Sequence, residues 1–187
     1  MIRSWSVTLL LLILLSTTLL AQNKRSGNRI EIEADPIAYI FRGYSFHLGY
    51  TMGHLRFDAG VFGIKQPDFA LENDLFSVYS SGVGIKIDYL IKRNKGLFIG
   101  LQSDYGTDKT GLKSSSTKVN SDGVTLGLRT GYRFMFGKKE NQCKGLYLVP
   151  WIALIHSPDP VTINESAHEY IQRQWSVFPT IHLGYRF

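Results

Sequence analysis

The feature that most constrains this chain is a succession of eight segments in which apolar and polar residues alternate. A β-strand turns successive side chains to opposite faces, so a period of two collects the apolar residues on one face. No part of the chain after residue 21 keeps the i, i+3, i+4, i+7 apolar spacing of an amphipathic helix, so the sequence predicts an all-β protein. The eight segments are Arg29–Phe41, Tyr44–Met52, Leu55–Lys65, Phe76–Lys92, Leu97–Tyr105, Val124–Phe136, Leu146–His156 and Trp175–Phe187.

The connections between these segments alternate in length, with the first one, near Arg42-Gly43, as the exception. Short connections follow the second, fourth and sixth segments, and longer ones follow the third, fifth and seventh. The short ones are Gly53-His54, Arg93–Gly96 and Gly137–Gly145, and the long ones reach Gly106–Gly123 and Ser157–Gln174. A tilted strand crosses a bilayer in roughly 9 to 11 residues. The series therefore predicts a transmembrane antiparallel up-and-down β-barrel of eight strands, with both termini on one side.

The composition of the polar face predicts which face looks inward. A soluble, lipocalin-like barrel would show the same alternation with its apolar face inside. Here, however, the polar face alternates Gly, Ser and Thr with isolated large polar residues, which suits the crowded interior of an eight-stranded barrel. We therefore expect a paired network of charges inside the barrel, because an unpaired ion out of water costs several kcal/mol. Its predicted members are Arg56, Asp58, Lys86, Asp88, Gln102, Asp104, Arg129, Arg133 and Arg186.

The N-terminal segment has the layout of a secretory signal peptide. Arg3 precedes an apolar run from Val7 to Leu15, and a small residue, Ala21, follows the polar stretch after it. The run is shorter than the roughly 20 residues that a membrane-spanning helix needs. The sequence thus predicts a signal peptide over residues 1–21 and a single barrel domain over residues 22–187.

The C-terminal residues carry the most specific signal. An aromatic residue ends the chain, and further aromatic or apolar residues stand at alternate positions before it: Ile181, Leu183, Tyr185 and Phe187. In this the sequence resembles the small bacterial outer-membrane barrels of the OmpX, OmpA and OmpW kind. The resemblance implies that these four residues form a membrane-insertion signal for the barrel-assembly machinery. It also implies export to the periplasm, a place in the bacterial outer membrane, and contact with its lipids and lipopolysaccharide.

Three prolines conflict with the strand series. Pro36, Pro150 and Pro179 fall inside predicted strands, although a closed barrel has no free edge where a missing N–H is harmless. Each of them predicts either a bulge or a displaced strand boundary.

The charges and the remaining motifs argue for neither nucleic acid nor a cofactor. The formal net charge of +6 could suit an acidic partner, but the basic residues are scattered, so we expect lipid headgroups or pairing inside the barrel. The histidines show no metal-ligand spacing, no glycine loop precedes a helix, and Cys143 has no cysteine to pair with. We predict no cofactor and no metal site.

Three functions remain open from the sequence. The first is a non-enzymatic envelope component or surface-binding scaffold with a filled interior, whose unknown ligand meets the loops 112–122 and 158–172. The second is a narrow channel. The third is a hydrolase that resembles the eight-stranded lipid A deacylases, with His156, Ser157 and either Glu165 or Glu169; the residues expected around that family's His-x-Ser element are absent, and His156 and Ser157 would face opposite ways in a strand. We predict the first, without catalytic residues.

Overall fold

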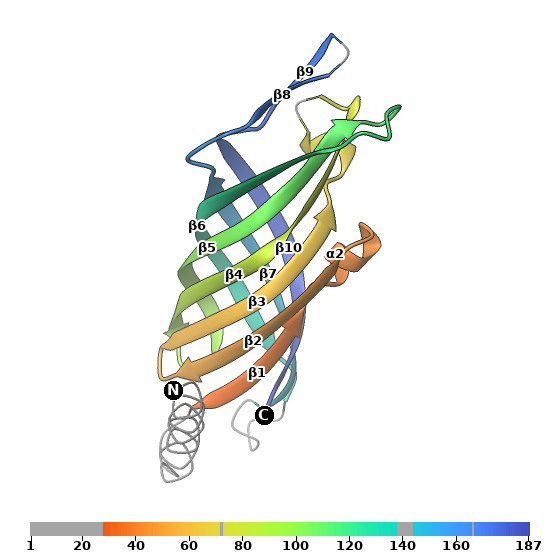
Figure 1. The fold of residues 1–187 in the computed structure, drawn as a ribbon. Helices are drawn as coiled ribbons and strands as arrows, with labels where there is room; N and C mark the ends of the chain where they lie inside the picture. Colours follow the sequence, from red (N-terminus) through yellow and green to blue (C-terminus); the bar gives the residue numbers. More distant parts are fainter. Residues whose placement is uncertain (1–27, 72, 138–143, 166) are drawn as a thin grey trace, which may run out of the picture.

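The protein is a closed barrel of eight antiparallel strands in the order β1-β10-β7-β6-β5-β4-β3-β2 (Figure 1). The computed structural model describes residues 28–71, 73–137, 144–165 and 167–187, so the predicted signal peptide lies outside the described residues. The predicted fold class is confirmed. The barrel strands are β1 (Arg29–Ala34), β2 (Tyr44–Met52), β3 (Leu55–Lys65), β4 (Phe76–Lys92), β5 (Lys95–Leu112), β6 (Val119–Met135), β7 (Gly145–His156) and β10 (Trp175–Arg186).

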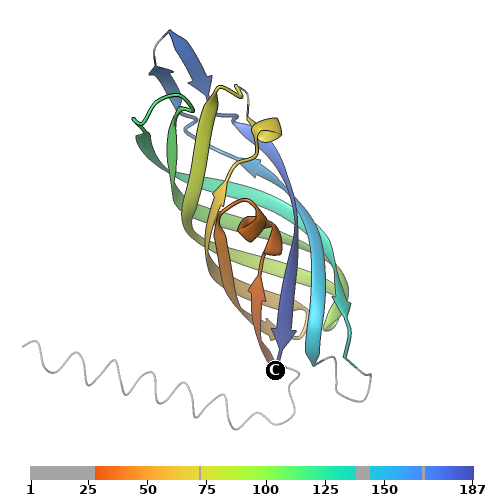
Figure 2. The same cartoon turned by 90° about the vertical axis from the view of Figure 1, so that its right-hand side faces the viewer.

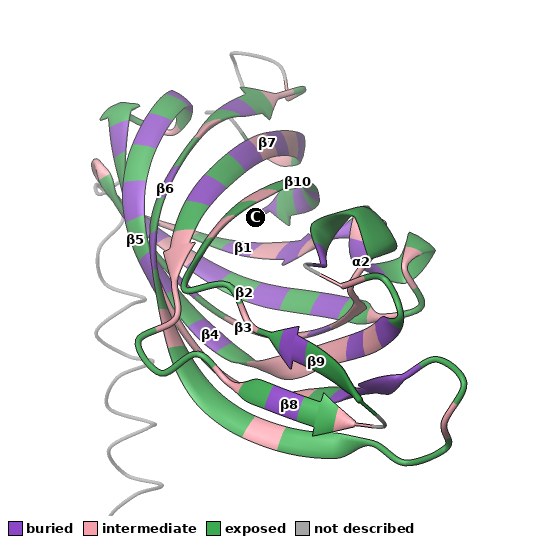
Figure 3. Ribbon diagram, turned by 90° about the horizontal axis from the view of Figure 1, so that it is seen from above, coloured by how far each residue is buried: buried purple, intermediate pink, exposed green. Residues whose placement is uncertain are grey.

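The barrel wall is apolar outside and polar inside. Along β4, Ile85, Ile87 and Tyr89 are exposed, whereas Lys86 and Asp88 between them are buried. Figure 3 shows the same alternation of buried and exposed residues along the other strands of the wall. This is the reverse of a soluble protein, in which exposed apolar surface is limited and buried charges are rare. The outer face of the wall therefore suits the hydrocarbon core of a membrane, and the ionic groups are on the inner face, away from the lipid.

The first strand is shorter than predicted, because the chain leaves the barrel ladder at Asp35. The Asp35 side chain accepts the N–H groups of Ile37 (2.8 Å) and Ala38 (3.4 Å), and Pro36 begins the helix α2 (Pro36–Ile40). Proline suits a first helical turn because the N–H it lacks has no partner there anyway. The prediction that this strand reaches Phe41 is thus wrong, and the displaced boundary expected at Pro36 is found. No helix among the described residues is long and apolar enough to cross a bilayer.

Helix α2 occupies a place in the barrel wall where β1 has ended. The pairing of β1 with β10 ends at Ala34 and Leu183, although β10 continues upward to Trp175. Figure 2 shows α2 beside that upper part of β10. The Tyr39 hydroxyl donates to the backbone oxygen of Ser45 in β2 (2.9 Å), so the helix is joined to the strand on its other side.

Pro150 and Pro179 remain within continuous strands, so the bulge or boundary predicted at each is not found. The pairing of β7 with β10 keeps one register past both residues. Pro150 instead lies where the pairing of β6 with β7 is interrupted. The pairing stops at Gly131 and Trp151 and resumes at Phe134 and Leu148. Pro179 lies on the part of β10 that has run past β1. Both prolines thus coincide with a ladder that is already incomplete on one side.

The long connections are more ordered than the sequence predicts. Residues 106–123, predicted as a loop, continue the β5–β6 pairing as far as Thr110 and Val119. Residues 157–174 contain a hairpin of β8 (Thr162–Glu165) and β9 (His168–Ile171). The connection from β3 to β4 contains a short 3-10 helix, η1 (Asp68–Ala70). The alternation fades here because water meets both faces of a strand once it has left the membrane.

Glycines on the inner face lie opposite large side chains. Each of five inward glycines is the direct cross-strand partner of a bulky residue whose atoms occupy the space of a glycine Cβ. The pairs are Gly60 with His47, Gly84 with Asp104, Gly100 with Asp88, Gly127 with Gln102, and Gly184 with Tyr147. Interiors are packed at crystal density, so each small residue makes room for one large one.

We predict that Gly184→Ala lowers the free energy of unfolding by about 1 to 3 kcal/mol, because the new methyl group overlaps the Tyr147 ring. Gly123→Ala is the matched control, since nothing lies within 4 Å of the Cβ position at Gly123. Urea unfolding in phospholipid vesicles measures both. Equal stability of the two variants would contradict the packing argument.

Candidate functional site: the charged interior of the barrel

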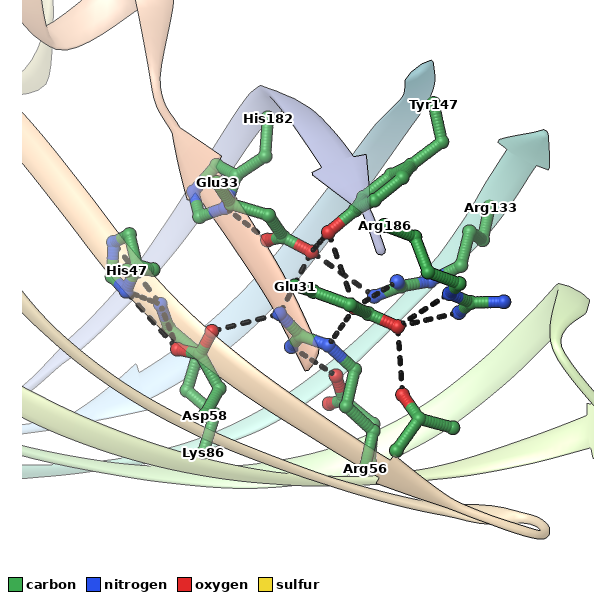
Figure 4. A network of polar contacts seen from close by, with 12 residues as sticks. Glu31, Glu33, His47, Arg56, Asp58, Lys86, Arg133, Tyr147, His182 and Arg186 are labelled. Atoms are coloured by element: carbon green, nitrogen blue, oxygen red, sulfur yellow. Dashed lines mark hydrogen bonds and ion pairs between the residues drawn. The ribbon is translucent and has the colours of Figure 1, made fainter. Parts of the chain in front are cut away.

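The charged network inside the barrel is centred on Glu31 of β1 (Figure 4). Its carboxylate accepts hydrogen bonds from Nε of Arg56 (2.9 Å) and Nε of Arg186 (2.7 Å), and it also pairs with Arg133. The hydroxyls of Thr51 (2.8 Å) and Tyr147 (3.1 Å) donate to the same carboxylate. Five side chains from five strands thus meet on one buried anion.

Glu33 forms the second centre, one inward position further along β1. It accepts from Nη2 of Arg56 (2.7 Å), from Nη2 of Arg133 (3.1 Å) and from the Tyr147 hydroxyl (2.8 Å). Nδ1 of His182 lies 2.9 Å from its other oxygen. Both glutamates therefore pair with arginines from the two sides of β1, Arg56 on β3 and Arg133 on β6. Charge-assisted hydrogen bonds of this kind are roughly twice as strong as neutral ones.

A third cluster extends the network toward β4. The Asp58 carboxylate accepts from Nη2 of Arg56 (2.8 Å) and from Nζ of Lys86 (3.2 Å), and Nδ1 of His47 lies 3.0 Å away. The His47 ring stacks on His182 with a centroid distance of 5.0 Å. Arg56 therefore bridges the glutamates of β1 and the aspartate of its own strand.

Arg129 is held mainly by aromatic rings. Its guanidinium carbon lies 4.2 Å from the Trp151 ring centroid and 5.3 Å from that of Phe98. Its Nε is 3.5 Å from Oδ1 of Asp88, which is long for an ion pair. Cation–π contact with desolvated rings is worth about 2 kcal/mol or more. Phe98 and Trp151 also belong to a buried apolar cluster inside the barrel with Leu90, Val149 and Ala153, so Arg129 lies where this cluster meets the charged network.

The structure places all nine predicted network residues on the inner face. Eight of them are buried, and Asp104 is partly exposed. It brings six of them into one connected cluster, which Arg129 joins through a longer contact to Asp88: Arg56, Asp58, Lys86, Asp88, Arg133 and Arg186. Gln102 and Asp104 bond to each other (2.9 Å). Sequence reasoning missed Glu31 and Glu33. The signal was present, because these two acids alternate with Ile30 and Ile32 as strictly as any other inward pair.

The network lies buried in the lower part of the barrel, and the two glutamates of β1 are its most fully bonded members. Burying ions costs several kcal/mol each, and their mutual attraction offsets that cost only where the hydrogen bonds are nearly complete. Here each carboxylate of β1 accepts from at least three donors. Among the described residues, no group of three or more His, Cys, Asp or Glu side chains is arranged to hold a metal ion.

The residues considered for hydrolysis are not brought together. His156 stacks on Trp175 with ring centroids 4.4 Å apart, and Trp175 is exposed on β10. The Glu165 carboxylate instead accepts the backbone N–H of Leu112 (3.0 Å). The backbone oxygen of Glu169 accepts from Asn73 (3.0 Å). Among the described residues, no hydrogen bond joins the Ser157 side chain to His156, Glu165 or Glu169.

The C-terminal residues of the predicted insertion signal all lie on the outer face. Ile181, Leu183, Tyr185 and Phe187 are exposed, while His182 and Arg186 between them are buried. Tyr185 and Phe187 meet edge to face, with centroids 5.1 Å apart. Recognition of these four residues by the barrel-assembly machinery stays a prediction.

The closed strand order, the apolar outer wall and the ionic interior define a small membrane-spanning β-barrel of the outer-membrane kind. No protein-family model matches the chain, and a search of curated proteins found no match. Among solved structures, the chain is similar to a major outer membrane protein from Thermus thermophilus, with 14% identity and a TM-score of 0.49, covering 87% of this chain and 100% of that one. It is also similar to Neisserial surface protein A, with 14% identity and a TM-score of 0.45, covering 86% and 96%.

We predict that Glu31→Gln lowers the free energy of unfolding by about 3 to 5 kcal/mol, because it leaves buried arginines without their shared counter-ion. Asp68→Asn is the control. It breaks an exposed ion pair with Lys113 of similar length (2.8 Å), and such pairs are worth about 1 kcal/mol or less. Unfolding midpoints in urea, read by gel mobility without boiling, compare the two. A Glu31 variant as stable as the Asp68 variant would show that the network is not what holds the barrel together.

Proposed function

We propose that the protein is a non-enzymatic scaffold of the bacterial outer membrane, which presents a folded binding head on the side opposite the termini. The single observation that carries this proposal is that the long connections pack together above the barrel instead of hanging free. Binding surfaces need such order, because a disordered loop must be fixed at an entropic cost when a ligand arrives.

The head has a small apolar core of its own. Residues of η1's connection, of the upper ends of β4 and β5, and of both hairpin strands are buried against one another. They are Leu71, Phe76, Val78, Leu112, Ile163 and Tyr170. Burial of this kind contributes about 25 cal/mol for each Å² removed from water. The core fixes the β8–β9 hairpin over the strands below it.

Polar contacts fasten the hairpin at three points. Nδ2 of Asn73 donates to the backbone oxygen of Glu169 (3.0 Å), and Glu165 accepts from Leu112 (3.0 Å). Nε2 of Gln172 donates to Asp108 (3.1 Å). A groove opens beside these contacts. It is lined by Asp74, Leu75, Leu112, Lys113, Ser114, Ser115, Ser116 and His168. Its hydroxyl and charged groups suit a polar ligand.

The test of this proposal replaces residues 162–171 by a short glycine-serine linker. Cells displaying the wild-type chain and the linker variant are compared on a glycan array and on immobilised lipopolysaccharide. We expect at least one probe to bind in a way that depends on the hairpin, while both proteins keep the boiling-dependent gel shift of a folded barrel. Absence of any hairpin-dependent binding would contradict the scaffold function.

The channel alternative is tested separately by reconstitution in planar bilayers. We expect no conductance steps from the wild-type protein, because buried ion pairs fill the lower barrel. Stable steps from a folded preparation would instead favour the narrow channel. The conductance of Glu31→Gln is compared with that of the wild type, because this substitution removes ion pairs from the network.

We predict that the head loosens in acid through Glu165. The backbone N–H of Leu112 and the Ser115 hydroxyl lower the pKa of this carboxyl below its ordinary 4.5. Its contribution is therefore present above pH 4.5 and is lost as the pH falls through the lowered pKa. The hydrogen-exchange protection factor of the Leu112 amide, which corrects for the pH dependence of intrinsic exchange, should fall over that range in the wild type. In Glu165→Gln the acid-dependent step should be absent, and in the control Glu169→Gln it should persist; an unchanged step in Glu165→Gln would refute the assignment.

A further inference from the structure

The rim of the barrel on the side of the termini carries exposed cations. Lys92, Arg93 and Lys95 stand at the β4–β5 turn, and Lys144 stands just before β7. All four are exposed, and none of them forms an ion pair with another described residue. The described residues of the turns on this side, 53–54, 93–94, 136–137 and 144, include no acidic side chain.

The opposite rim has a mixed charge. Lys113 there pairs with Asp68 (2.8 Å), and Nζ of Lys118 donates to the backbone oxygen of Leu112 (2.8 Å). Asp74, Asp122 and Asp159 are exposed on the same side. In the described parts of the two rims, acidic side chains therefore accompany the exposed cations on the opposite rim but not in the turns beside the termini.

The basic turn is held in place by the charged interior. Nη1 of Arg186, at the end of β10, donates to the backbone oxygen of Asn94 (2.7 Å). Asn94 and Gly96 both take positive φ angles, 75° and 90°, which close the turn tightly. Residues fixed in this way lose less freedom on binding than residues of a loose loop.

Lipid-facing side chains lie directly beside these cations. Ile91 and Leu97 flank the basic turn and are 57% and 52% exposed, and Leu146, two residues after Lys144, is 55% exposed. The rings of Tyr132 and Phe134, on the neighbouring β6, lie in contact with centroids 4.4 Å apart at the same end of the barrel. Long basic side chains reach from the edge of an apolar band to headgroup depth. A partner that binds away from the bilayer would not need cations next to lipid-facing side chains.

We propose that Lys92, Arg93, Lys95 and Lys144 form a basic collar that binds anionic phospholipid headgroups in the leaflet on the side of the termini. The proposal rests on the membrane placement given above. It adds the leaflet and the chemical class of lipid that the barrel selects. A phosphate ester beside a glycerol headgroup supplies the negative charge, and the apolar band receives the acyl chains.

The experiment uses spin-labelled phosphatidylglycerol and phosphatidylcholine with the barrel reconstituted in phosphatidylcholine vesicles. Electron paramagnetic resonance gives the relative association of the two lipids with the protein. The test variant carries Lys92→Gln, Arg93→Gln, Lys95→Gln and Lys144→Gln. The matched control removes four cations from the other rim, by Arg42→Gln, Lys65→Gln, Lys109→Gln and Lys113→Gln. Each preparation is checked for insertion by its gel shift on boiling.

We expect the wild type and the control to prefer phosphatidylglycerol by about five- to tenfold at low salt, and the collar variant to lose most of that preference. High salt should weaken the preference, because exposed charges are screened. Inserted protein with equal preference in wild type and collar variant would overturn the collar, and so would a loss confined to the control. The collar would also be overturned if the four residues were needed for co-sedimentation with purified peptidoglycan but not for the lipid preference. That result would assign them to the cell wall. Failure of the wild type to insert would instead overturn the proposed membrane function.

Discussion

The interaction on which the rest of this structure depends is the meeting of Glu31 and Glu33 with the arginines of the facing strands. Arg56, Arg133 and Arg186 are almost fully buried, and they have no water to solvate them. The two carboxylates of β1 are the anions that Arg56 and Arg133 share. A soluble barrel is stabilised mainly by apolar side chains at its centre, whereas here apolar side chains cover the outside, and the interior combines ionic hydrogen bonds with an apolar cluster that includes Leu90 and Trp151.

The alternating pattern was sufficient to predict most of this architecture. Eight strands, their antiparallel order and the inward direction of Lys86, Arg129 and Arg133 follow from the period of two and from the small residues opposite the large ones. The pattern works because lipid and the crowded interior impose opposite requirements on neighbouring residues. Where water meets both faces, as along β5 above Gly106, that requirement disappears and the sequence no longer marks the strand.

The other two discrepancies have different causes, one local and one that depends on distant parts of the chain. Asp35-Pro36 has the sequence of a helix start, a capping residue followed by proline, but it stands inside an alternating stretch that continues to Phe41. Glu31 and Glu33 were missed although their alternation with isoleucine is regular. The partners of a buried charge lie on strands far away in sequence, so which anion meets which cation could not be read from spacing. Tyr147 illustrates this, since its hydroxyl bonds to both glutamates from β7, more than 100 residues away in the sequence.

The short first strand has a consequence for how the cylinder is completed. Backbone pairing between β1 and β10 runs only from Glu31 and Arg186 to Ala34 and Leu183, whereas β10 pairs with β7 along its whole length. The seam between the first and last strands is therefore the weakest in main-chain terms, and side-chain bonds such as Arg186 to Glu31 and His182 to Glu33 cross it. An eight-stranded sheet with only this seam unpaired is an open ribbon held by seven strand pairings, and closing it brings these ionic groups out of water together.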